Sequence, residues 1–188
     1  MGLKMAVAHG KPKHTYEDYA KLPEGERVEL VDGEFFVSPS PRTRHQALLG
    51  KLYRILAEWT ESHLAGTVFP APTDVVLSKH DVVQPDIFFI SKARLSIITE
   101  LNIQGAPDFI IEILSPGEEK RDMVIKKALY EKYGVKEYWI VDPDAQTIFA
   151  YDLKSSRFVL RKTFKTKETI ASFVLSGFAL SLAELFMP

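Results

Sequence analysis

Two short apolar stretches, each marked by one carboxylate, constrain the fold of this chain more than any other feature. Residues 109–114 are apolar except for Glu112, and the apolar run 87–90 follows directly on Asp86. An apolar run of this length is typical of a strand that is covered on both faces of a sheet. Because a buried carboxylate is costly without a partner, the pair indicates a cation between neighbouring strands.

The composition fits one soluble domain. The 188 residues are 46% hydrophobic and 26% charged, and we expect a disordered lead-in over residues 1–14 and a single domain over 15–188. The chain has no cysteine, which excludes a disulfide framework, a thiolate zinc site and a cysteine nucleophile, and fits the cytoplasm. No stretch resembles a signal peptide or a membrane span, so we expect a cytoplasmic protein without a membrane partner. The net charge of −1 neither requires nor excludes nucleic acid.

The first half of the domain predicts a hairpin and a long helix. Thr15 and Asp18 have the spacing of a capping box and open a short helix. Asp32-Gly33 separates two β-rich runs, as in a two-residue hairpin turn. Apolar residues recur at helical spacing over 41–64. Strands are expected at 67–77 and 82–90, with irregular structure over 91–106.

The second half predicts one more helix and a strand meander. A helix is expected over 118–133, ended by Gly134, followed by strands at 137–141, 147–151 and 158–164. The tail SLAELF is expected to form a terminal helical turn. This order of elements predicts an α/β or α+β fold, with helices flanking a mixed central sheet and a hairpin near the N-terminus.

Asp86 and Glu112 are the first candidates for chemistry. Asp86 follows Pro85 and has a simple alternative role as a turn or bulge residue. The alternative for Glu112 is a structural ion pair with a lysine or arginine. Two carboxylates on neighbouring strands suit Mg²⁺ or Mn²⁺, because hard cations prefer oxygen ligands and keep positions open for phosphate. We therefore assign both residues as candidate metal ligands.

Lys126 is the third candidate. At 100° per residue, Asp122, Lys126 and Tyr130 fall on the side of Leu129, the expected core stripe, whereas Lys127 points away. An inward ammonium group can pair with Glu112, orient a water molecule or stabilise developing negative charge. The alternative is a surface pair between Asp122 and Lys126.

The combined motifs resemble a known family. The run GAPDFIIEILSP, then RD-x₃-K-x₃-Y and GVKEYWIVDP, with ELVDGE and PDI upstream, is similar to the Uma-type family, a branch of the PD-(D/E)XK superfamily of restriction-endonuclease-like proteins. The resemblance covers roughly residues 15–153. It implies a metal-dependent endonuclease that acts on DNA, and a homodimer.

The resemblance also implies site residues. Asp86 corresponds to the aspartate of the PD motif and Glu112 to the second acidic residue, but the lysine position of the motif holds Leu114. The resemblance thus places the motif lysine on the following helix, at Lys126. Glu29 matches a family acidic position and His45 a family histidine.

Several assignments stay open at this stage. Glu29 is either a further catalytic residue or an exposed residue paired with Arg27 or with a neighbour across the hairpin. The opening turns of the long helix carry Arg42, Arg44, His45 and Lys51, which either form a solvated face or line a groove for a polyanion. His45 itself either touches phosphate at the site rim, with Arg44, or is a structural histidine. Asp108 repeats the PD dipeptide as either a decoy or an outer group. Two other functions remain: a catalytically silent nucleic-acid-binding module, and a structural or regulatory homodimer.

Overall fold

A six-stranded mixed sheet forms the centre of the molecule. The computed structural model describes residues 13–23, 27–115, 117 and 121–187. The central strands, in spatial order, are β11 (Arg157–Lys165), β10 (Thr147–Lys154), β9 (Glu137–Asp142), β8 (Phe109–Ile113), β6 (Ile87–Ser91) and β3 (Gly66–Pro70). Strands β8 and β9 are parallel and the other neighbours are antiparallel. The predicted mixed sheet is confirmed.

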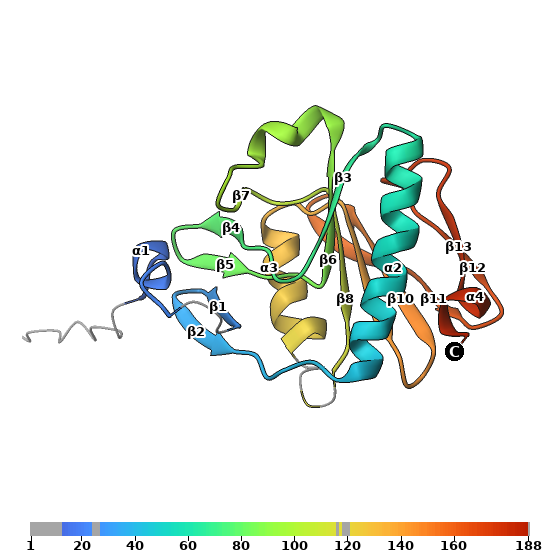
Figure 1. Ribbon diagram of the computed structural model, residues 1–188, viewed down its shortest axis with the longest axis horizontal. Helices are drawn as coiled ribbons and strands as arrows, with labels where there is room; N and C mark the ends of the chain where they lie inside the picture. The colour runs from blue at the N-terminus through green and yellow to red at the C-terminus, as the bar shows by residue number, and fades with distance from the viewer. Residues whose placement is uncertain (1–12, 24–26, 116, 118–120, 188) are drawn as a thin grey trace, which may run out of the picture.

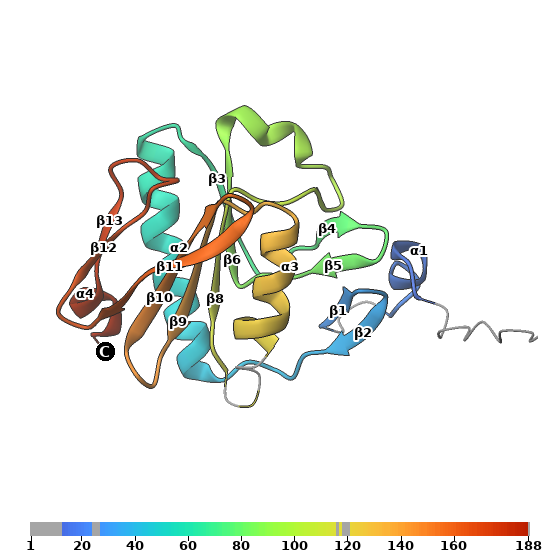
Figure 2. The same cartoon turned by 180° about the vertical axis from the view of Figure 1, so that it is seen from behind.

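Helices cover both faces of this sheet (Figures 1 and 2). Helix α2 (Thr43–Ser62) packs Leu48, Leu52 and Leu56 into one core. On the opposite face lie a π-helical segment, η2 (Arg121–Lys126), and α3 (Lys127–Lys132). The chain crosses from β8 to the parallel strand β9 through these helices, as a parallel pair requires a long connection.

The two faces of β8 belong to different cores. Ile111 and Ile113 pack with the leucines of α2, whereas Ile110 and Leu114 pack with Leu129 of α3. Side chains alternate along a strand, so Glu112 faces the side of η2 and α3. The apolar run around Glu112 is therefore the doubly covered strand that the sequence predicts.

A smaller five-stranded sheet stands beside the central one. Its order is β2 (Glu34–Val37), β1 (Val28–Val31), β5 (Asp81–Val83), β4 (Val75–Ser78) and β7 (Ile103–Gln104). The predicted hairpin is confirmed, because β1 pairs with β2 across Asp32 and Gly33, whose φ values are 51° and 78°. Positive φ at both central residues is the requirement of a type I′ turn.

Two predicted strands are each split in the structure. The expected strand 67–77 becomes β3 and β4, and the expected strand 82–90 becomes β5 and β6. Pro72 and Pro85 fall in the breaks. Since proline has no N–H to donate to a ladder, the chain leaves one sheet at each break and enters the other. The irregular segment 91–106 also holds a 3₁₀ helix, η1 (Lys92–Ile97).

The two ends of the domain pack against these layers. Helix α1 (Tyr16–Tyr19) begins with the predicted capping box of Thr15 and Asp18. Most of the expected lead-in, residues 1–12, lies outside the described residues. The backbone N–H of His14, within the expected lead-in, donates a hydrogen bond to the carbonyl oxygen of Gly33 in the hairpin turn. At the other end, β12 (Thr169–Ala171) and β13 (Ala179–Ser181) precede the predicted terminal helix, α4 (Leu182–Phe186).

Among the described residues, no helix is both long enough and apolar enough to cross a membrane.

Candidate active site

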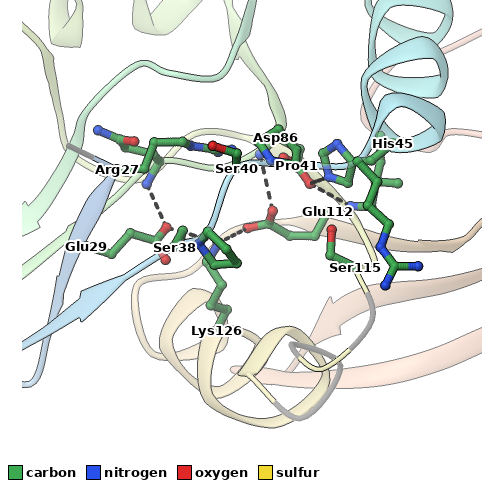
Figure 3. Close-up of a pocket in the computed structure, with 14 residues that line it drawn as sticks. Arg27, Glu29, Ser38, Ser40, Pro41, His45, Asp86, Glu112, Ser115 and Lys126 are labelled. Carbon is green, nitrogen blue, oxygen red and sulfur yellow. Dashed lines mark hydrogen bonds and ion pairs between the residues drawn. The ribbon is translucent and has the colours of Figure 1, made fainter. Parts of the chain in front are cut away.

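A polar cavity of about 250 Å³ lies where the two sheets meet the start of α2. The linker from β2 to α2 passes the end of β8 there (Figure 1). Side chains that line the cavity come from the hairpin, the linker, α2, β8 and η2. Figure 3 shows these side chains pointing toward one another. The cavity is lined by Arg27, Glu29, Ser38, Pro39, Ser40, Pro41, Arg42, His45, Gln84, Asp86, Glu112, Ile113, Ser115 and Lys126.

Asp86 and Glu112 meet through the pairing of β6 with β8. Ile87 lies opposite Ile111 in this antiparallel pair, so one further step along each strand places Asp86 opposite Glu112. The backbone N–H of Asp86 donates to Glu112 Oε2 at 3.2 Å, and that of Ile113 donates to Asp86 Oδ2 at 2.8 Å. Both carboxylates are buried. The predicted acidic pair is thus present, with Glu112 within β8 and Asp86 immediately before β6.

His45 lies beside Asp86. Its Nε2 is 3.0 Å from Asp86 Oδ2, and its ring is buried near the first turn of α2. Burial raises the pKa of Asp86, but the hydrogen bond and charge of His45, the charge of Lys126 and the Ile113 N–H outweigh burial. They hold the pKa below its ordinary value. Asp86 is therefore a carboxylate at neutral pH.

Lys126 enters the cavity from η2. Its Nζ lies 2.7 Å from Glu112 Oε1 and 3.0 Å from Glu29 Oε1. Lys127 instead lies over the ring of Tyr151, with Nζ 4.3 Å from the ring centroid. The structure confirms that Lys126 is the inward lysine. The side chain of Asp122 lies outside the described part of the helix.

Glu29 is brought to the same lysine by the smaller sheet. It is 3% exposed, and its Oε1 also accepts the backbone N–H of Gln84 at 2.9 Å. The alternative of an exposed residue is wrong, because Glu29 is buried and forms an ion pair with Lys126. Lys126 therefore joins the hairpin to β8.

Comparison with known proteins decides the family. The family model described as Uma2, putative restriction endonuclease, matches residues 16–183. The chain belongs to the Uma2 family. A crystal structure described as a putative nuclease belonging to DUF820 from Anabaena variabilis shares the fold. Its TM-score is 0.76 at 24% identity, over 92% of this chain and 97% of that chain. Comparison with curated proteins finds no match. The predicted restriction-endonuclease-like family and fold are confirmed.

Tyr130 also belongs to this Uma2 site. The sequence predicts it on the inward face of the helix but assigns it no role in the site. Its hydroxyl donates to Glu112 Oε1 at 2.6 Å. Burial, and then the negative charge of Glu112, raise the pKa of Tyr130 well above its ordinary value, so the hydroxyl stays a donor. The spacing of four residues from Lys126 was the available signal, since such residues share a helix face.

Two other candidates lie away from the Uma2 cavity. Arg44, expected at a phosphate rim, pairs with Asp144 at 2.7 Å and does not line the cavity. Asp108 is at the opposite end of β8, where it pairs with Lys136 at 2.7 Å and accepts the N–H of Ser91 at 2.9 Å. Asp108 therefore acts as a structural ion-pair residue in this fold.

The donors of the cavity fit a hard metal ion. Asp86 and Glu112 offer only oxygen ligands, and the chain has no cysteine. Such donors suit Mg²⁺ or Mn²⁺ better than softer metals. Within the described ranges, however, no group of three or more histidine, aspartate or glutamate side chains is arranged to hold a metal. The candidate ligand set from protein side chains is thus the pair Asp86 and Glu112, which would leave other positions to water and substrate.

Proposed function

We propose that this protein is a Mg²⁺- or Mn²⁺-dependent endonuclease that hydrolyses phosphodiester bonds of DNA. One observation carries the proposal: Asp86, Glu112 and Lys126 come from three different elements and converge in one small polar cavity. The membership in the Uma2 family supports the same reaction class. Perturbed, buried charges gathered in a cavity are characteristic of functional sites.

Asp86 and Glu112 would hold the metal ion. When bound, a metal ion of this kind polarises the phosphoryl oxygens and makes a water molecule more acidic. His45 orients Asp86 through the contact at Oδ2, and Tyr130 orients Glu112 through the contact at Oε1. Hydrogen-bonded partners behind a ligand fix its direction and strengthen its binding.

Lys126 is the catalytic cation in this proposal. Its ammonium group lies between Glu112 and Glu29, which fixes its position close to the metal ligands. From there it orients the attacking water and stabilises the negative charge that develops on the phosphate. Glu29 is a positioning residue, because it acts by holding Lys126.

A catalytically silent nucleic-acid-binding module is the second candidate. One observation favours it: Lys126 and Tyr130 both contact Glu112 Oε1, while the N–H of Asp86 donates to Oε2. A metal ion must therefore compete with these donors for Glu112. In such a module the same contacts would serve only to fasten η2 and α3 to the sheet.

The family resemblance also leads us to propose a homodimer. Light scattering of the purified protein should then give twice the chain mass of 21.3 kDa. A single chain mass at the concentrations used for activity would contradict a dimeric enzyme.

Cleavage of supercoiled plasmid DNA tests the function. The wild type should nick the plasmid with Mg²⁺ or Mn²⁺ but not with EDTA, whereas Asp86→Asn and Glu112→Gln should be slower by about 100-fold or more. Asp108→Asn is the matched control, because it removes the other PD aspartate, which lies outside the cavity. Equal cutting by all variants would refute the site. Binding without cutting by the wild type would favour the silent module.

A further inference from the structure

Two arginines differ from the others in their ionic contacts. The chain has eight arginines, and the structure describes the side chains of all but Arg121. Five of these seven pair with a carboxylate within 4.0 Å: Arg44, Arg54, Arg94, Arg157 and Arg161. Arg27 and Arg42 form no ion pair within the described part of the chain, and both line the candidate active site.

The two arginines approach the cavity from different elements. Arg27 immediately precedes β1 and lies at the end of the cavity where Glu29 is found (Figure 3). Arg42 is the N-cap residue of α2, three residues before His45, which lies at the opposite end. The carboxylates of Asp86 and Glu112 are between these ends. The two arginines therefore lie on either side of the carboxylates of Asp86 and Glu112, here called the carboxylate floor.

The charges of the cavity leave a role for an anion. Lys126 is already engaged by Glu29 and Glu112, so the two guanidinium groups are the lining cations without a described carboxylate partner. A guanidinium group matches the geometry of phosphate through two parallel N–H donors.

The volume of the cavity limits the size of the ligand that it can hold. Its volume of about 250 Å³ is below the range of roughly 300–1,000 Å³ that is usual for pockets enclosing a drug-sized ligand. Such a space suits a phosphate group with water or an ion, rather than a whole nucleotide with its base. Contacts made here would hold the backbone of a nucleic acid and would not read its sequence.

We propose that Arg27 and Arg42 bind phosphate groups of the substrate strand, on either side of the carboxylate floor, independently of sequence and of metal. The inference rests on the proposed function for its substrate class, but concerns binding alone. The sequence alone presents Arg27 only as a possible partner of Glu29. The absence of that pairing leaves Arg27 available for phosphate.

Anisotropy of fluorescent single-stranded DNA tests this assignment. The full chain is titrated in EDTA, at several salt concentrations, against two oligonucleotides of unrelated sequence. Arg27→Gln and Arg42→Gln should each weaken binding about tenfold for both sequences. Each should also reduce the slope of log affinity against log salt by about 0.7, the value for one phosphate contact on a single strand. Arg54→Gln is the control, because it removes the same charge from helix α2 at a position outside the cavity.

The outcomes separate this inference from the nuclease proposal. The assignment would be overturned if Arg27→Gln and Arg42→Gln bind DNA with the affinity of the wild type. It would also be overturned if the wild type does not bind DNA in EDTA. A loss confined to one of the two sequences would also overturn it, since backbone contacts act on all sequences alike. Arginine-dependent binding by a protein that never cuts DNA would keep the inference and reject the hydrolysis. Thermal unfolding of each variant confirms that the fold is retained.

Discussion

The Nζ atom of Lys126 lies 2.7 Å from Glu112 Oε1, although fourteen residue numbers separate the two in sequence. The position two residues after Glu112 holds Leu114, which packs in the apolar core beneath α3. Lys126 instead reaches Glu112 from the last residue of the π-helical segment η2. Segments of π-helix are rare and recur at functional sites. A helix thus supplies to the carboxylates the cation that the strand lacks.

Replacing Lys126 by methionine should abolish cleavage and weaken the fold. Methionine preserves the length of the side chain but leaves Glu29 and Glu112 buried without their shared cation. Breaking a buried pair in this way costs about 3–5 kcal/mol, which urea unfolding at neutral pH would measure. Lys127→Met is the matched control and should change neither property strongly, because Lys127 lies over Tyr151. An unchanged unfolding free energy for Lys126→Met would contradict the buried ion pair.

Moving the lysine back to the strand should restore part of the activity. Leu114 is two residues from Glu112 and therefore faces the same side of the sheet. The double variant Leu114→Lys/Lys126→Met should cut plasmid DNA at least about tenfold faster than Lys126→Met alone, since a cation again stands beside Glu112. A double variant no faster than Lys126→Met would show that the direction of approach from η2 is essential.

His45 should control metal affinity through Asp86. Its Nε2 lies 3.0 Å from Asp86 Oδ2, and loss of a residue behind a metal ligand typically lowers affinity by about 10–100-fold. Calorimetric titration with Mn²⁺ should show a loss of that size for His45→Leu and a smaller loss for His45→Gln, which keeps a donor. His63→Leu, on the exposed end of the helix region, is the control. Equal affinities for His45→Leu and wild type would remove His45 from the site.

Asp108 should affect acid stability and not cleavage. Burial raises the pKa of Asp108, but the hydrogen bonds from Lys136 and Ser91 and the charge of Arg94 outweigh burial and hold the pKa below the ordinary value. A depressed pKa in the folded state gives stability that is present above the unfolded value of 3.8 and is lost as pH falls through the folded value.

Urea unfolding as a function of pH measures this contribution. The gap in unfolding free energy between wild type and Asp108→Asn should be constant from pH 7 down to about 5 and shrink below about pH 4. Plasmid cleavage by Asp108→Asn at pH 7 should match that of the wild type. A gap that stays constant to pH 3 would contradict the low pKa of Asp108.

The sequence predicts the architecture well where one element has one role. The hairpin turn at Asp32-Gly33, the long helix α2 and the buried strand β8 follow directly from turn chemistry and periodicity. The split strands were not predicted, because a proline shows where a ladder ends but not which sheet the chain joins next. Strands β12 and β13 are three residues each, too short for an alternating pattern to stand out.

The candidate site is predicted where burial conflicts with charge. Glu112 stands out in an apolar strand, and helical periodicity aims Lys126 inward even though the helix begins as a π-helix. Tyr130 and Arg27 carry no such conflict: a tyrosine on an inward stripe looks like a core residue, and an arginine before a strand looks solvated. Their positions depend on long-range contacts that only the folded chain creates, as with Tyr130 and Glu112.

A crystal of the wild-type protein soaked with Mn²⁺, examined by anomalous scattering, tests the central claim most directly. We predict one anomalous peak within ligand distance of the carboxylates of both Asp86 and Glu112, and no peak there in Glu112→Gln. A saturating soak that leaves this position without a peak, or places Mn²⁺ only on other carboxylates, would contradict the assignment of Asp86 and Glu112 as the metal ligands.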